Sequence, residues 1–165
     1  MLAAPTGKAA VRLRSSIQKA LASLALEPEI ESVVPTQVST VHKLLGARSH
    51  SKSFYHNAQQ PLALDLLVLD EASMLDVELF SALLSALPAK ARLVLLGDKD
   101  QLASVEAGAL LGSLCAFAAE GRYSNATMQW LSALGDAPLP AELEAAVPQA
   151  LDQQIAMLRQ SYRFS

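Results

Sequence analysis

The stretch that decides the fold is Leu-Val-Leu-Asp-Glu-Ala-Ser-Met, residues 67 to 74, in which an apolar run ends in two adjacent carboxylates. A second, mainly apolar run, residues 92 to 96, is followed by Gly97 and Asp98. Nearly continuous apolar runs are typical of strands that are buried on both faces of a parallel sheet. The two runs therefore predict parallel strands that each deliver polar groups to their carboxyl ends.

Helical and extended segments alternate around these two runs. The expected strands are residues 2 to 4, 64 to 69 and 92 to 96, and the expected helices are residues 8 to 26, 41 to 45, 79 to 87 and 105 to 120. This alternation predicts an α/β fold with a doubly wound, mainly parallel sheet, whose ligands bind at the carboxyl ends of the strands. Residues 121 to 150 contain three prolines and no strand pattern, and we expect them to form a mostly helical, peripheral insertion.

Several residues are of types that commonly begin or end helices. Pro28 and the acids around it are expected to end the first helix, and Pro88 the third. Ser39 or Thr40 can cap the short helix of residues 41 to 45, which Gly46 closes.

The composition predicts one globular domain over residues 1 to 165. Hydrophobic residues make up 52% of the chain and charged residues 18%. Cys115 is the only cysteine, which excludes an internal disulfide and a Cys-rich zinc site and favours a reducing, cytoplasmic setting. No signal-peptide pattern begins the chain, and no apolar run is as long as a membrane span requires, so we expect no membrane association.

The charge is distributed unevenly along the chain. Residues 1 to 60 hold seven Lys or Arg against three acids, whereas residues 61 to 165 hold six against thirteen. A basic front half favours a polyanion such as single-stranded nucleic acid, because phosphate contacts release counterions. An ordinary solvated surface explains the same counts equally well.

Asp70 and Glu71 carry the strongest chemical signal. An Asp-Glu pair at the carboxyl end of a buried strand has the form of a Walker B element, in which one carboxylate serves Mg²⁺ and the next polarises the attacking water. Alternatively, the two acids simply cap the helix that follows. Asp76 is better placed to begin that helix, which leaves Asp70 and Glu71 available for a metal and a water.

The turn of residues 5 to 8 is not a complete phosphate loop. The pattern G-x-x-x-x-G-K-[ST] requires a glycine where Leu2 stands and a hydroxyl where Ala9 stands. Without them the backbone cannot wrap a triphosphate, and Mg²⁺ loses a ligand. A strand-to-helix turn with free amides and a lysine still fits a single phosphate, such as one in a DNA backbone.

Three further polar residues are candidates for the functional site, and each also has an ordinary structural explanation. Gln101 follows the second strand and could reach the same ligand, although residues 97 to 101 also read as a common turn. Arg163 could be a ligand contact or an exposed charge. His42 lies on a short capped turn, where histidine is more often a structural hydrogen-bonding residue than a catalyst.

Together these segments resemble superfamily 1 DNA helicases, and in particular the RecD family of exodeoxyribonuclease V subunits. The matching segments occur in family order: residues 2 to 10, 39 to 46, 67 to 76, 96 to 108 and 161 to 164. The resemblance implies a RecA-like, P-loop NTPase-type sheet, ATP and Mg²⁺ as cofactors, and single-stranded DNA as a partner.

The resemblance also implies a role for each segment. The residues that look like contacts to single-stranded DNA are Pro5, Thr6, Gly7 and Lys8, in motif Ia, and Thr40 and His42, near the DNA path. In motif II, Asp70 looks like the Mg²⁺ ligand and Glu71 like the residue that orients the attacking water. The remaining nucleotide contacts look like Gly97, Asp98 and Gln101 of motif III, whose glutamine senses the γ-phosphate, and Arg163 of motif IV.

The chain departs from that family at both ends. It shows no upstream phosphate loop and no second motor domain, so we expect a fragment of the first motor domain with a truncated sheet. Because the missing phosphate-loop strand normally lies inside the sheet, we expect an exposed edge or a gap, and copies of the chain could associate through an exposed edge. We expect such a fragment to be inactive alone and to bind no cofactor stably.

For the parent protein, the resemblance implies an ATP-dependent 5′-to-3′ DNA helicase that acts with RecB and RecC subunits in double-strand break repair. Two alternatives stay open. One is a non-catalytic module that binds DNA or a partner subunit on a helicase scaffold. The other is part of a related superfamily 1 motor, such as the helicase part of a conjugative relaxase.

Overall fold

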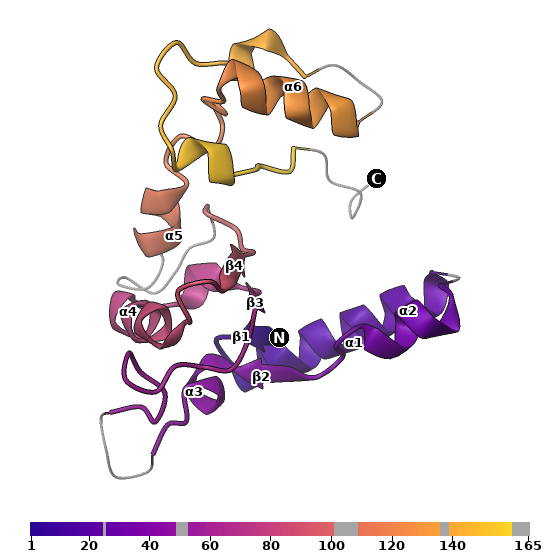
Figure 1. Cartoon of the computed structure of the whole chain (residues 1–165), viewed down its shortest axis with the longest axis vertical. Coiled ribbons are helices and arrows are strands. Elements are labelled where there is room, and N and C mark those ends of the chain that lie inside the picture. The colour runs from indigo at the N-terminus through magenta and orange to yellow at the C-terminus, as the bar shows by residue number, and fades with distance from the viewer. Residues whose placement is uncertain (25, 49–52, 101–108, 136–138, 160–165) are drawn as a thin grey trace. The chain divides into compact units, whose positions relative to one another are not determined.

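The computed structural model describes residues 1–24, 26–48, 53–100, 109–135 and 139–159 of the chain (Figure 1). It divides the chain into two compact units, Met1–Leu111 and Gly112–Ser165. The first unit contains the sheet and the second contains a small helical cluster. No helix in the described ranges is long and apolar enough to cross a membrane.

The first unit is built on a four-stranded parallel sheet. Its strands are β1 (Leu2–Ala4), β2 (Val38–Thr40), β3 (Leu66–Leu69) and β4 (Arg92–Leu95), in the order β2-β1-β3-β4. The predicted α/β fold and parallel sheet are confirmed. Sequence reasoning missed β2, whose residues were expected only to cap a helix; two of its three residues, Val38 and Thr40, are β-branched and suit a pleated strand.

Helices connect these strands and extend into the second unit. They are α1 (Gly7–Ser23), α2 (Pro28–Val33), α3 (Val41–Leu44), η1 (Ala72–Met74), α4 (Val77–Ala86), α5 (Ala109–Leu114), α6 (Asn125–Leu134), η2 (Ala141–Leu143) and η3 (Asp152–Gln154). Helix α1 contacts both β1 and β2. Two expected caps are confirmed, because Thr40 accepts from the backbone N–H of Lys43 and Asp76 from that of Leu79.

Two helix boundaries differ from those expected. Pro28 begins α2 rather than only ending α1, because proline fits the first turn of a helix, where its missing N–H has no partner to lose. The helix expected over residues 105 to 120 is described only as Ala109–Leu114. After it the bonds from Ala118 to Cys115 and from Glu120 to Phe117 each span three residues, so the chain tightens into turns.

Burial in the sheet also differs from the expectation that both strands are covered on both faces. Leu67 and Leu69 of β3 are fully buried, but Leu66 is 42% exposed and Val94 of β4 is 40% exposed. The exposed residues alternate with more buried ones along both strands, and the register pairs Leu66 with Arg92 and Val68 with Val94, so one face of the sheet is less covered than the other. An exposed sheet edge was expected.

The second unit packs around the ring of Tyr123. Its buried cluster consists of Tyr123, Met128 and Leu143. The Tyr123 hydroxyl donates a 2.7 Å hydrogen bond to the carbonyl oxygen of Ile155, and the Gln153 amide oxygen accepts from the backbone N–H of Ser124, which caps α6. These bonds connect α6 to the segment around η3.

Candidate functional site

The candidate site lies along one edge of the sheet, where the four parallel strands end. The register pairs Ala4 with Thr40 across β1 and β2, and it pairs Leu69 with Ala3 on one side and with Leu95 on the other. The segments that follow β2 and β1 are therefore neighbours, and so are those that follow β3 and β4. The predicted DNA residues occupy one half of this edge, and the predicted nucleotide residues that the structure describes, Asp70, Glu71, Gly97 and Asp98, occupy the adjacent half.

Asp70 and Glu71 begin directly after β3. The backbone N–H of Asp70 donates to the carbonyl oxygen of Ala3 at 3.0 Å, and the Asp70 carboxylate accepts from the backbone N–H of Glu71 at 2.9 Å. Both residues are half-buried. The cap of α4 is Asp76, and Glu71 makes no side-chain cap bond to η1. The alternative that these two acids are simply helix caps therefore loses its structural basis.

The backbone of Glu71 is left-handed, with φ 55° and ψ 38°. A residue with a Cβ atom in this region costs about 1–2 kcal/mol relative to the right-handed region. Strained backbone that the surrounding fold enforces is concentrated at functional sites. The strain is thus a second, independent reason to single out Glu71.

Gly97 packs its backbone against η1. A Cβ atom at this position would lie 2.9 Å from a side-chain carbon of Leu111, 3.1 Å from the Ala72 nitrogen and 3.2 Å from the Ser73 nitrogen. The Ala72 N–H also donates to the carbonyl oxygen of Leu96 at 2.8 Å. A side chain at residue 97 would crowd these atoms, so glycine suits this close approach of the turn after β4 to the turn after β3.

Asp98 shapes the next part of this turn. Its carboxylate accepts a 3.0 Å hydrogen bond from the backbone N–H of Asp100, which is the pattern of an Asx turn. The structure therefore places Asp98 beside the Asp70–Glu71 turn through Gly97. Gln101 and Arg163, the other two predicted nucleotide contacts, lie outside the described residues, and their roles stay predictions.

The turn after β1 is a capped helix start. The Thr6 hydroxyl accepts from the backbone N–H of Ala9 at 3.2 Å, which begins α1. Gly7 has open space where a side chain would stand, and Lys8 is exposed. Pro5 to Lys8 therefore present an accessible turn with a cation at its end.

The turn after β2 lies beside the turn after β1. The Thr40 hydroxyl is occupied as the cap of α3, with a 3.2 Å bond from the Lys43 N–H. His42 is exposed, and its ring meets the ring of Phe54 edge-on with centroids 6.0 Å apart. This ring contact does not decide between the two roles expected for His42, a structural hydrogen bond and a contact near the DNA path, so both stay predictions.

Helix α1 carries a basic face that continues from Lys8. Arg12 and Lys19 follow at intervals of four and seven residues, which places the three cations on one side of the helix, over about 16 Å. All three are exposed, α1 contains no acidic residue, and the ion pairs found in the described ranges do not involve it. We call these three residues the α1 basic face.

The carboxylates of this edge suit the way in which proteins hold magnesium. Mg²⁺ keeps several waters and is held by one or two carboxylates together with substrate phosphates. Asp70, with Glu71 beside it, meets that requirement.

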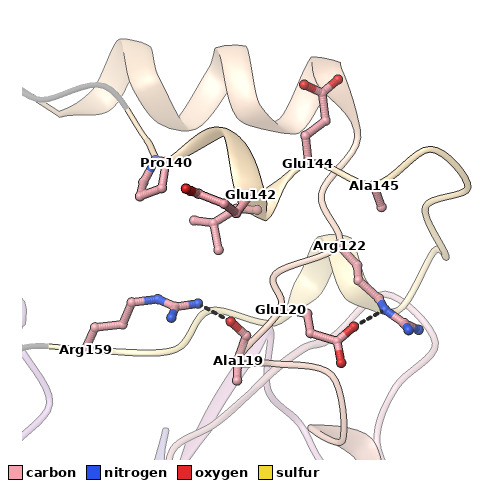
Figure 2. Close-up of a pocket in the computed structure, with 9 residues that line it drawn as sticks. Ala119, Glu120, Arg122, Pro140, Glu142, Glu144, Ala145 and Arg159 are labelled. Atoms are coloured by element: carbon pink, nitrogen blue, oxygen red, sulfur yellow. Dashed lines mark hydrogen bonds and ion pairs between the residues drawn. The ribbon is translucent and has the colours of Figure 1, made fainter.

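A separate pocket of about 520 Å³ lies in the second unit. Arg122 pairs with Glu120 at 2.8 Å, and the Arg159 guanidinium donates to the carbonyl oxygen of Ala119 at 2.6 Å. Both interactions are drawn in Figure 2. Two further acids, Glu142 and Glu144, line it, so both signs of charge are present. None of the predicted site residues that the structure describes contributes to this pocket.

Ser73 is a residue that sequence reasoning passed over. It is 2% exposed, and its hydroxyl oxygen is buried without a hydrogen-bond partner in the described part of the chain. Its place two residues after Glu71 was visible in the sequence. Its burial was not, because burial depends on how Gly97 packs against η1.

Comparison with known proteins agrees with this arrangement. Residues 1–107 match the family model described as an AAA domain. The RecBCD enzyme subunit RecD of Haemophilus influenzae is 43% identical over 136 residues, which are 80% of this chain and 21% of that protein. The RecD subunit of Buchnera aphidicola from Acyrthosiphon pisum is 30% identical over 164 residues, 99% of this chain and 27% of that protein.

A third relative carries a different name. The ATP-dependent RecD2 DNA helicase of Deinococcus radiodurans is 42% identical over 107 residues, 65% of this chain and 12% of that protein. The chain thus spans between about an eighth and about a quarter of the length of these relatives. The match includes the whole sheet and the edge that holds the candidate site.

Proposed function

This chain belongs to the family of AAA domains and is RecD-like in sequence, and from that premise we propose that it forms part of the motor of an ATP-dependent DNA helicase. The observation that carries the proposal is the order of the strand ends. Asp70 and Glu71, at the end of β3, lie directly beside the turn after β1, which begins the predicted DNA half. A motor that couples phosphate chemistry to DNA contact needs these two sites as neighbours.

The nucleotide half provides the groups that phosphoryl transfer to water requires. Asp70 would hold Mg²⁺, and the half-buried Glu71 would orient the attacking water. ATP with its magnesium ion, when bound, supplies the phosphoryl group and neutralises the developing charge. Gly97 and Asp98 would respond to the phosphates through their contact with η1, and we assign Gln101 and Arg163 to the γ-phosphate.

The DNA half provides groups that contact a phosphate backbone. The turn of residues 5 to 8 offers accessible backbone amides and Lys8, and Thr40 with the exposed His42 lies beside it. The α1 basic face extends the positive surface away from this turn. Single-stranded DNA is the polyanion that we propose for this half.

The names of the relatives support a proposal for the partners and the biological role of a longer protein that contains this sequence. RecBCD enzyme subunits act in a complex, and we propose RecB and RecC subunits as partners of a longer protein that contains this sequence. We further propose 5′-to-3′ translocation, a role in double-strand break repair and a cytoplasmic location. Self-association through the exposed edge of β4 would be a property of the isolated chain.

The proposal is tested in a longer protein that contains this sequence together with a phosphate loop. Glu71→Gln should leave nucleotide binding within about twofold and reduce DNA-stimulated ATP turnover by at least about a thousandfold, because the water loses its orienting carboxylate. Glu78→Gln is the matched control, since Glu78 is exposed in the first turn of α4. Near-normal turnover by Glu71→Gln would remove Glu71 from this role.

The α1 basic face favours one alternative function, a module that binds DNA without catalysis. Unpaired cations along a helix without acids suit a backbone-binding surface whether or not ATP is used. The same longer protein distinguishes the two functions. Salt-dependent binding of single-stranded DNA in the complete absence of ATP turnover would favour the non-catalytic module.

A further inference from the structure

Ser73 has a buried hydroxyl without a hydrogen-bond partner in the described part of the chain. Its side chain is 2% exposed. Burying a hydroxyl without a partner is unfavourable, so such groups are rare and require an explanation. Helix capping is not the explanation, because Ser73 lies inside η1 and the cap of α4 is Asp76.

The position of Ser73 suggests what the hydroxyl is for. It lies in η1, two residues after Glu71, and its backbone nitrogen is 3.2 Å from the place of a Cβ on Gly97. The adjacent Ala72 N–H already bonds to the carbonyl oxygen of Leu96. Ser73 is thus placed where the turn that carries the carboxylates meets the turn after β4.

Solvent cannot supply the missing partner. The hydroxyl oxygen exposes less than 1 Å² to solvent, so a partner has to come from a neighbouring segment of the chain. The segment packed against Ser73 is the turn of residues 97 to 100, which is largely exposed on its other side. Three of its four residues are exposed and Lys99 is half-buried, so this turn is the described neighbour that could move relative to Ser73.

We propose that Ser73 is a positioning residue, whose hydroxyl donates to a carbonyl oxygen of the turn of residues 97 to 100 when nucleotide occupies the site. This bond would connect the segment that carries Glu71 to the turn that carries Asp98. The carboxylate that orients the water and the turn that faces the phosphates would then move together when nucleotide binds. The inference rests on the proposed ATPase function. It adds a residue that acts on the reaction through Glu71 rather than by touching substrate.

The first test measures stability in the absence of nucleotide. Ser73→Ala in this chain should unfold at the same temperature as the wild type or at a higher one, because the variant removes an unpaired buried hydroxyl. Ser85→Ala is the control, since the exposed Ser85 hydroxyl donates to the carbonyl oxygen of Ser81 at 2.9 Å. A midpoint for Ser73→Ala several degrees below both wild type and control would show that the hydroxyl already has a partner, and would overturn the proposal.

The second test measures turnover in the longer protein with its phosphate loop. Ser73→Ala and the nearly isosteric Ser73→Cys should both reduce DNA-stimulated kcat by about tenfold to a hundredfold, with KM for ATP changed by less than about threefold. A structural defect would instead lower stability and the amount of active enzyme, which titration of nucleotide sites measures.

The outcomes separate the inference from the function on which it rests. Wild-type turnover by both Ser73 variants, with Glu71→Gln inactive, would overturn the role of Ser73 and leave the ATPase assignment standing. Normal turnover by Ser73→Cys alone would also overturn it, because the hydroxyl would then be dispensable. Absence of turnover in the wild-type protein would overturn both.

Discussion

The backbone N–H of Asp70 lies 3.0 Å from the carbonyl oxygen of Ala3, to which it donates a hydrogen bond. This bond joins the first residue of the nucleotide half to the strand that leads into the turn of residues 5 to 8. A displacement of either turn along the strand direction must therefore be shared by its neighbour or must break the bond. The contact gives the two halves of the site a direct mechanical connection.

The 165-residue chain alone should not hydrolyse ATP. Its sequence contains no G-x-x-x-x-G-K-[ST], so Asp70 and Glu71 have no enclosed triphosphate on which to act. Phosphate release by the purified chain, measured with and without single-stranded DNA, should stay at the level of a Glu71→Gln sample. DNA-stimulated release above that level would contradict the prediction.

Replacing Glu71 by glycine should stabilise the chain. The left-handed backbone at residue 71 disfavours any residue with a Cβ atom, so Glu71→Gly should raise the free energy of unfolding by about 0.5–1 kcal/mol after the greater flexibility of glycine in the unfolded chain is allowed for. Urea denaturation measures this change. Glu78→Gly, on the right-handed helix α4, should lower the same free energy by about 1 kcal/mol. Equal effects at the two positions would mean that Glu71 is not strained.

Adding one methyl group at Gly97 should destabilise the first unit. The new Cβ of Gly97→Ala would meet a side-chain carbon of Leu111 at 2.9 Å and the Ala72 nitrogen at 3.1 Å, which should cost about 1–3 kcal/mol. Gly135→Ala is the control, because nothing lies within 4 Å of a Cβ there. Thermal unfolding of both variants compares them, and similar midpoints would refute the close packing of the two turns.

Binding of single-stranded DNA should depend on the α1 basic face. Each of Lys8→Ala, Arg12→Ala and Lys19→Ala should weaken binding of an oligonucleotide and reduce the magnitude of the slope of log affinity against log salt by about 0.7. Fluorescence anisotropy at several salt concentrations gives both quantities. Arg92→Ala serves as the control, because Arg92 is an exposed cation at the opposite end of the strands.

The pattern of losses among the four variants decides which part of α1 contacts DNA. Wild-type affinity and slope in all three α1 variants would identify the basic face as ordinary solvated surface. A loss confined to Lys8→Ala would restrict the contact to the turn of residues 5 to 8. Equal losses in Arg92→Ala would point to a general effect of net charge.

Local sequence signals predicted much of this fold. The apolar runs located β3 and β4, and the caps Thr40 and Asp76 were identified because side-chain capping depends on residues only three positions apart. The pairing of polar groups with strand ends then located most of the site edge. These features are local, so one sequence suffices to find them.

The features that sequence reasoning missed depend on contacts between distant segments. Strand β2 is short and exists because it pairs with β1, some 36 positions earlier in the register. The left-handed backbone of Glu71 and the burial of Ser73 both arise where η1 packs against Gly97. The sequence of residues 67 to 74 alone gives no indication of that contact.

The backbone conformation of Glu71 has a consequence for anyone who engineers this chain. Glycine and asparagine are tolerated in the left-handed region better than glutamate. A library selected only for heat resistance would therefore tend to replace Glu71 and so discard the proposed water-orienting carboxylate. A thermostable version of this protein has to be sequenced at position 71 before its inactivity is attributed to anything else.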